Sequence, residues 1–269
     1  MSKLLSAEFM RLLKAKIFWI CFGFMAAFGI FIGLKVEKGV DFDQAFFIFP
    51  LVMGFVLAAF CSLFIGTEYS DGTLRNKLIV GHKRGVVYLT NLLVCFTAAL
   101  SMTLVSLFTV CVLGVPRLGW FTEDTKVILL LLLISFLLLL SYTAVYTLVC
   151  MLISSKAIAA VGCLLGVMVL MVVAATVKSR LEEPKYYDFY TYTDSAGTTE
   201  EDTQPNPNYL SGTKREVYQA VLEILPTGQS LQISLWTVVN PLRMAGYSLI
   251  IIFVTTLAGI LVFQRKDLK

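Results

Sequence analysis

The chain has 269 residues, of which 58% are hydrophobic and only 15% are charged, and its formal net charge is +4. Soluble domains carry about 25% charged residues, whereas this chain contains six predominantly apolar, charge-free runs of 18 to 32 residues. Each run reaches the roughly 18 apolar residues that mark a membrane-spanning helix. The composition therefore excludes a soluble enzyme, a secreted domain, a nucleic-acid-binding protein and a β-barrel, and it predicts an all-α polytopic membrane protein with six transmembrane helices.

Residues 2–16 predict an amphipathic helix that lies in the membrane interface before the chain enters the bilayer. Its expected apolar stripe consists of Leu5, Phe9, Leu12 and Leu13. Basic side chains that can reach anionic headgroups are those of Lys3, Arg11 and Lys14. The competing interpretation is a charged flank of the first span.

The six spans are expected within residues 17–34, 45–66, 85–116, 127–155, 157–177 and 244–264. The fourth is leucine-rich on every face, which favours contact with lipid. With a cytoplasmic N-terminus, twelve basic residues lie on the inner side and only four in the short outer loops, as the positive-inside rule requires. We therefore expect a multi-pass protein of the cell membrane, in particular a bacterial plasma membrane, with both termini in the cytoplasm.

Small residues in the fifth span point to close helix packing. Gly162 and Gly166 have the GxxxG spacing, and Ala159 precedes them by one turn. Such residues let two helix backbones approach closely. The three residues are candidates for a helix-packing or dimer face, although this spacing also arises by chance in apolar sequence.

The chain divides into residues 1–177, with the interfacial helix and spans one to five, an extracytoplasmic segment 178–243, and residues 244–269, with span six and a tail. In the outer segment we expect a strand over Tyr186–Thr193 and a loop over 195–212. An amphipathic helix over 213–225 should end at Pro226. Apolar residues at helical spacing over 231–242 predict a short further helix. This segment is thus expected to contain both α and β structure.

Several chemical groups are missing from the sequence. No Asp, Glu, Lys, Arg or His lies in the central part of any span, and no GxxxxGK[ST] phosphate loop is present. The chain has one histidine, His82, and six cysteines that all lie inside spans. We expect no catalytic, cofactor-binding or metal-binding residues, so any energy for work must come from another polypeptide.

The loop between the second and third spans is the most informative polar stretch. Asp71-Gly72-Thr73 is a turn and helix-start signal, and Gly81 is a natural helix stop. Between them the sequence predicts a helix of about two turns, with Leu74 and Leu78 on one face. Such a helix suits docking of a soluble partner, in whose cleft Leu74 and Leu78 would be buried, and the alternative is an ordinary basic loop.

The pattern of this loop resembles the permeases of the type-two ATP-binding-cassette (ABC) exporter family. The residues that carry the resemblance are Glu68, Gly72, Thr73, Leu74, Arg75, Leu78, Lys83 and Arg84. The resemblance implies that residues 67–84 hold a coupling helix, which docks on a separate cytoplasmic ABC ATPase subunit. It also implies a second permease copy or paralogue, and ATP and Mg²⁺ bound only by the ATPase. No nucleic-acid partner is expected, and membrane lipid surrounds the spans.

The stretch Leu225–Gln229 resembles the bacitracin and lantibiotic export and immunity subunits. The implied function is ATP-driven export of a hydrophobic or amphipathic substrate, such as a peptide antibiotic, a lipid or a drug. The alternative is a non-transporting membrane binding or sensory protein that captures a ligand with the Tyr-rich outer segment. A channel is disfavoured because no charged ring or carbonyl filter is recognisable.

Overall fold

The computed structural model describes residues 2–36, 41–193 and 199–267, and within these ranges it describes the side chains of all but residues 2 and 188–203. The N-terminal half contains helices α1 (Ser2–Lys14), α2 (Lys16–Lys35), α3 (Phe42–Phe46), α4 (Phe49–Ser70), α5 (Thr73–Ile79) and α6 (Arg84–Leu118). The C-terminal half contains α7 (Thr125–Leu152), α8 (Lys156–Glu182), β1 (Tyr186–Thr193), β2 (Thr199–Pro205), α9 (Gly212–Ile224), α10 (Pro226–Ser234) and α11 (Pro241–Arg265).

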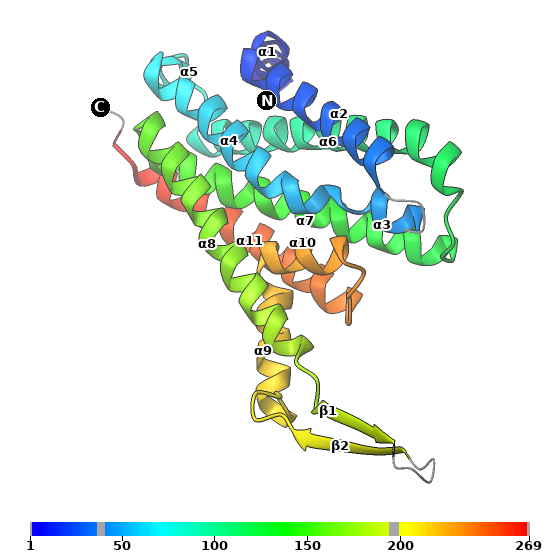
Figure 1. Ribbon diagram of the computed structural model, residues 1–269. Helices are drawn as coiled ribbons and strands as arrows, with labels where there is room; N and C mark the ends of the chain where they lie inside the picture. Colours follow the sequence, from blue (N-terminus) through cyan, green and yellow to red (C-terminus); the bar gives the residue numbers. More distant parts are fainter. Residues whose placement is uncertain (1, 37–40, 194–198, 268–269) are drawn as a thin grey trace.

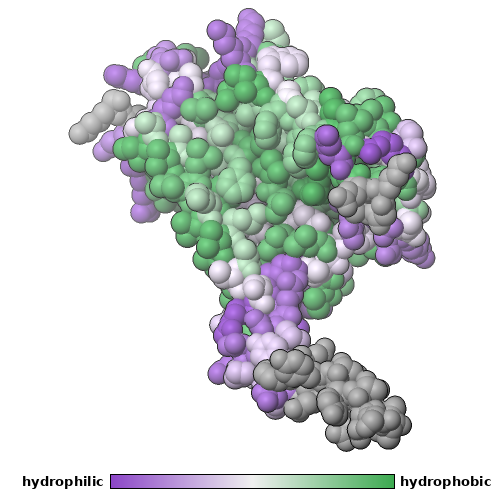
Figure 2. Space-filling model, viewed as in Figure 1, coloured by the Kyte–Doolittle hydropathy of each residue, from purple (hydrophilic) through white to green (hydrophobic). Residues whose placement is uncertain are grey.

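Six stretches of helix within the described residues are long and apolar enough to cross a membrane: α2, α3 with α4, α6, α7, α8 and α11. Apolar side chains cover the middle of the face seen in Figure 2, and hydrophilic ones gather over α1 and α5 and over α9. The chain ends lie on the same side as α1 and α5 (Figure 1), which we call the termini side. This arrangement is that of a multi-pass membrane protein.

The six apolar helices are unequally covered by the rest of the chain. In α3–α4, 67% of the most apolar 18-residue stretch is buried, and in α7 the corresponding share is 56%. In α8 and α11 only 22% and 17% are buried. The leucine-rich α7 is therefore an interior helix that packs on α4 and α11, contrary to the expectation that it faces lipid. The helices left open to lipid or to another protein are α8 and α11.

Close packing of α2 on α6 depends on a glycine. A Cβ atom at Gly29 would lie 2.6 Å from the backbone oxygen of Ser106, closer than real Cβ atoms approach other atoms. The neighbouring Gly23 on the same helix has no atom within 4 Å of its Cβ position. Gly29 thus lets the two helix backbones touch, whereas Gly23 faces open space.

The small residues of the fifth span do not share one face. Ala159 is buried in the bundle, in line with Cys163 and Val167. Gly162 and Gly166 are exposed, and no atom lies within 4 Å of the Cβ position of either. The predicted face is therefore corrected: Ala159 packs within this chain, and the two glycines remain open.

Beyond α8 the chain leaves the bundle on the side opposite the termini (Figure 1). The predicted strand Tyr186–Thr193 is present as β1, and it pairs antiparallel with β2. The strand β2 corrects the expectation of a loop over 195–212. Its residues form a strand because they pair with β1, and the local sequence does not indicate this pairing. Residues 194–198 and the side chains of most of the Tyr-rich stretch lie outside the described residues.

The helix predicted over 213–225 is present as α9, and it ends one residue before Leu225. The next helix, α10, begins at Pro226 and ends at Ser234, so it lies upstream of the predicted position. Proline favours the first turn of a helix because its fixed φ suits that position and its missing N–H has no helical partner there. Trp236, with a φ of 55°, then prevents the helix from continuing through the apolar residues that follow.

We expect Gly29→Leu to lower the stability of the purified protein by about 1–3 kcal/mol, because the added side chain has no space between α2 and α6. The thermal unfolding midpoint in detergent measures this effect. Gly23→Leu is the matched control, since it adds the same side chain to the same helix where nothing obstructs it. Equal midpoints for the two variants would contradict the described α2–α6 contact.

Candidate functional site

Helix α5 lies at the termini side, and two glycines define its ends. After α4, Gly72 adopts a φ of +66°, a left-handed conformation that a side chain would oppose. Gly81 adopts a φ of +101° just beyond the helix. The predicted helix of about two turns is thus present, and it has seven residues.

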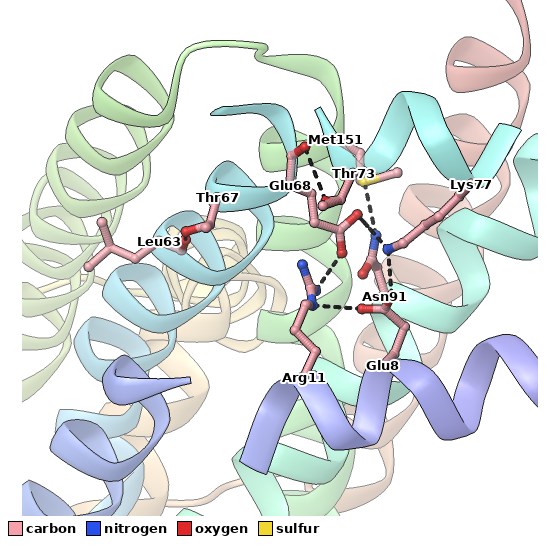
Figure 3. A network of polar contacts seen from close by, with 9 residues as sticks. All are labelled: Glu8, Arg11, Leu63, Thr67, Glu68, Thr73, Lys77, Asn91 and Met151. Carbon is pink, nitrogen blue, oxygen red and sulfur yellow. Dashed lines mark hydrogen bonds and ion pairs between the residues drawn. The ribbon is translucent and has the colours of Figure 1, made fainter. Parts of the chain in front are cut away.

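Under α5 lies the fully buried carboxylate of Glu68, near the end of α4 (Figure 3). Two cations from other elements contact it. Lys77 of α5 places its Nζ atom 2.8 Å from one carboxylate oxygen, and Arg11 of α1 pairs with the other oxygen. The Arg11 guanidinium also stacks 3.9 Å from the centre of the Phe64 ring.

A second carboxylate, that of Glu8, contacts the same two cations. Its oxygens lie 2.8 Å from the Arg11 Nε atom and 2.6 Å from the Lys77 Nζ atom. Glu8, Arg11, Glu68 and Lys77 therefore form a closed ring with two positive and two negative charges, which we call the charge ring. Removing a charge from water is costly, and pairing with opposite charges in this way offsets the cost. The ring joins α1, α4 and α5.

Further hydrogen bonds connect the charge ring to α6 and α7. The Asn91 side-chain amide of α6 donates to Glu68 over 3.2 Å and lies 3.6 Å from the sulfur of Met151. The Thr73 hydroxyl donates to the backbone oxygen of Glu68 over 3.4 Å. Movement of α5 would therefore displace contacts with four other helices, namely α1, α4, α6 and α7.

A neighbouring set of contacts holds the end of α11. Arg84 donates to the backbone oxygen of Phe263 over 3.0 Å and to that of Lys266. A cation at a helix C-terminus satisfies free carbonyl groups and interacts favourably with the helix dipole. Lys266 in turn donates to the Tyr69 hydroxyl over 2.8 Å and to the Met151 backbone oxygen over 3.1 Å. Partial burial lowers the pKa of Lys266.

The structure divides the predicted coupling residues into an inner and an outer group. Leu74 is 1% exposed and packs in the core of its own chain, and Leu78 is partly buried against the same core. The expectation that these two leucines form the docking face is therefore wrong, because intramolecular packing already covers them. Arg84 caps α11, as described above. Of the predicted residues, Arg75 and Lys83 are exposed.

Other residues form the outward surface of α5 and the turn after it. Ile79 and Val80 are 71% and 77% exposed, next to the exposed polar side chains of Arg75 and Asn76. Sequence reasoning missed this apolar pair because the helical spacing of Leu74 and Leu78 marked the opposite face. The signal was present as two consecutive β-branched residues directly before Gly81.

Sequence reasoning also missed Glu8, Lys77 and Asn91, and it assigned Arg11 to lipid headgroups, whereas the structure pairs Arg11 with Glu8 and Glu68. The signal that could have marked Glu8 is that it is the only acidic residue in the predicted N-terminal helix. The buried face of α1 is formed by Leu4, Glu8 and Leu12, at a spacing of four residues. Of the predicted apolar stripe, Leu12 is buried in the chain, whereas Leu13 is 53% exposed. The helix turns its one carboxylate inward, where that carboxylate pairs with Lys77 of α5 and with Arg11 of the same helix.

No protein-family model matches the chain, and no curated protein matches it. The functional argument therefore depends on the charge ring, on the exposed surface of α5 and on the apolar helices around them.

We expect Glu68→Gln to destabilise the protein by roughly 3–5 kcal/mol, because it leaves the buried Arg11 and Lys77 with one carboxylate between them. Backbone amides of α5 should exchange with deuterium about tenfold faster or more, since α5 loses its anchor. Asp71→Asn is the matched control, because Asp71 is exposed and belongs to no described ion pair. If both variants show the same exchange in α5, Glu68 does not hold this helix.

Proposed function

We propose that the chain is the transmembrane permease subunit of an ATP-driven ABC exporter of the type-two class. In this proposal a separate cytoplasmic ATPase subunit docks on α5 and its flanks, within residues 67–84, and supplies the energy. The observation that carries the proposal is that α5 has an exposed outer face and an inner face joined to the spans by the charge ring.

The outer face of α5 suits a protein partner. Ile79 and Val80 present adjacent apolar side chains at the polar end of the molecule, where the chain itself leaves them exposed. Arg75 beside them can make forked contacts with acidic groups of a partner, which lysine cannot copy. A cleft with an apolar floor and an acidic rim would complement this surface.

The inner face of α5 provides a route for force. When the ATPase moves α5, Lys77 moves with it, and Lys77 contacts both Glu68 and Glu8. The displacement therefore reaches α4, which is the second span, and α1, which precedes the first span. A flexible loop would absorb such a movement, whereas a helix held by paired buried charges transmits it.

The open helices α8 and α11 suit a second permease copy or paralogue. Gly162 and Gly166 leave room for the close approach of another helix backbone. The proposed substrate is hydrophobic or amphipathic, such as a peptide antibiotic, a lipid or a drug. The subgroup resemblance adds peptide antibiotics through Leu225–Gln229, which consists of the single residue between α9 and α10 and the first four residues of α10.

The proposal requires α5 in the cytoplasm and the segment around α9 outside. We expect a cysteine at Asn208 to react with a membrane-impermeant maleimide in intact cells, and a cysteine at Asn76 to react only after lysis. Both positions are exposed in the structure, and the six native cysteines lie within the apolar helices. Labelling of Asn76→Cys in intact cells would invert the topology and remove the ATPase docking site from the cytoplasm.

The docking surface is tested with the tagged protein purified from its native membranes in mild detergent. We expect a co-purified chain that hydrolyses Mg²⁺-ATP and is labelled by a photoreactive ATP analogue. Arg75→Glu and Ile79→Asp should each reduce the recovered ATPase activity about tenfold or more. A tenfold loss corresponds to about 1.4 kcal/mol of binding free energy. Lys3→Glu is the control, since Lys3 is exposed on the same side but lies in α1.

Two outcomes would contradict the proposal, the first its permease assignment and the second its docking site on α5. The first is an intact, stable protein that carries no ATP-hydrolysing chain. The second is full recovery of the ATPase with both α5 variants. The first outcome favours the non-transporting binding or sensory protein with a Tyr-rich outer segment, whereas the second places the ATPase contact elsewhere on the chain.

A further inference from the structure

A pocket of about 390 Å³ opens beside the charge ring on the termini side. Its walls come from the bend between α1 and α2, the end of α4, the turn before α5 and the first residue of α8. We propose that this pocket binds the phosphate of an anionic phospholipid from the leaflet on the termini side. The inference does not depend on the proposed transport function.

The charge of the pocket suits an anion. Lys14, Lys16 and Lys156 line it, and none of the three forms an ion pair with another described residue. Asp71 is the only acidic residue among its lining residues. Arg11 also lines the pocket, but the charge ring already neutralises it. Three lysines against one carboxylate leave an excess of two positive charges.

The depth of the pocket matches that of lipid headgroups. Lys16 and Lys156 are the first residues of the apolar helices α2 and α8, so the pocket lies where the apolar belt begins. Trp19, one turn into α2, is 53% exposed and donates from its indole nitrogen to the backbone oxygen of Leu13 over 2.8 Å. Tryptophan concentrates at the membrane–water interface. Basic pockets between helices at this level bind anionic headgroups.

One of the lysines is held in position by the bundle. A Cβ atom at Gly66 of α4 would lie 2.8 Å from the Cγ atom of Lys156. The stem of Lys156 therefore packs directly on the α4 backbone, and Lys156 lines the pocket. Because Lys156 opens a long helix, the positive end of the α8 dipole adds to the attraction for a phosphate.

The apolar part of the pocket distinguishes a lipid from a free phosphate ion. Ile17, Leu63 and Phe64 form part of the wall. Figure 3 shows the side chain of Leu63 extending away from the charge ring. From Leu63 a stripe of half-buried side chains continues along α4 through Ala59, Phe55 and Val52. An acyl chain can follow this stripe while the phosphate remains at the lysines.

The test uses the full-length protein in detergent, with lipid binding followed by native mass spectrometry. The probes are phosphatidylglycerol, phosphatidylcholine with the same acyl chains, and glycerol 3-phosphate, which carries the headgroup phosphate without chains. We expect wild-type protein to bind phosphatidylglycerol about tenfold more tightly or better than phosphatidylcholine. Glycerol 3-phosphate should not displace the bound phosphatidylglycerol.

The variant with Lys14→Gln, Lys16→Gln and Lys156→Gln should lose about tenfold or more in affinity for phosphatidylglycerol. Its control carries Lys3→Gln, Lys83→Gln and Arg265→Gln, which remove the same charge from exposed positions at the same end of the molecule. That control should bind phosphatidylglycerol within about twofold of wild type. Asp71→Asn should bind it more tightly than wild type, since the only lining carboxylate is removed.

Three results would overturn the proposal. Equal losses in the two triple variants would indicate general attraction of anionic lipid to a basic surface. Equal binding of the two phospholipids would remove the role of charge. Displacement of the lipid by glycerol 3-phosphate would make the pocket a site for free phosphate groups.

Discussion

A carboxylate that is removed from water needs cations or hydrogen-bond donors beside it, and the fully buried carboxylate of Glu68 has both. It lies near the end of the second span, and the two cations that contact it come from α1 and α5. A third partner, Asn91, comes from α6. The requirement to pair one buried charge thus fixes the N-terminal helix, the short helix after α4 and the start of the third span relative to one another.

The charge ring and the adjacent pocket share Arg11. Its guanidinium faces the two carboxylates and stacks on Phe64, and both Arg11 and Phe64 also line the pocket. An anion bound at the three lysines would therefore lie next to the contacts that hold α1. In this way the side chain of Arg11 and the ring of Phe64 link the occupancy of the proposed lipid site to the position of α5.

The opposite end of the molecule is held together differently. Gln229 of α10 donates to the backbone oxygens of Glu223 over 2.7 Å and of Met244 over 3.2 Å, and it accepts a hydrogen bond from Ser248 over 2.8 Å. These buried bonds fix α9 and α10 on the last span without a closed set of ion pairs. The ion pairs among the described residues there are separate ones, between Lys178 and Glu182 over 2.7 Å and between Glu223 and the exposed Arg243 over 3.9 Å. Among the described residues, the closed ring of ion pairs lies on the termini side, next to α5.

The sequence by itself determined the elements that depend on local composition. Long charge-free runs specify the apolar helices because a hydrocarbon environment excludes charge, and Gly72 and Gly81 specify the ends of α5 because each needs a positive φ. Only the tertiary structure decided which helix faces are covered. Helical periodicity shows that Leu74 and Leu78 share a face, or that Gly162 and Gly166 do, but a face becomes interior only when another helix packs on it. For the same reason the meeting of Glu8, Arg11, Glu68 and Lys77 was decided by the packing of α1, α4 and α5, since the pairing of charges so far apart in the sequence leaves no local pattern.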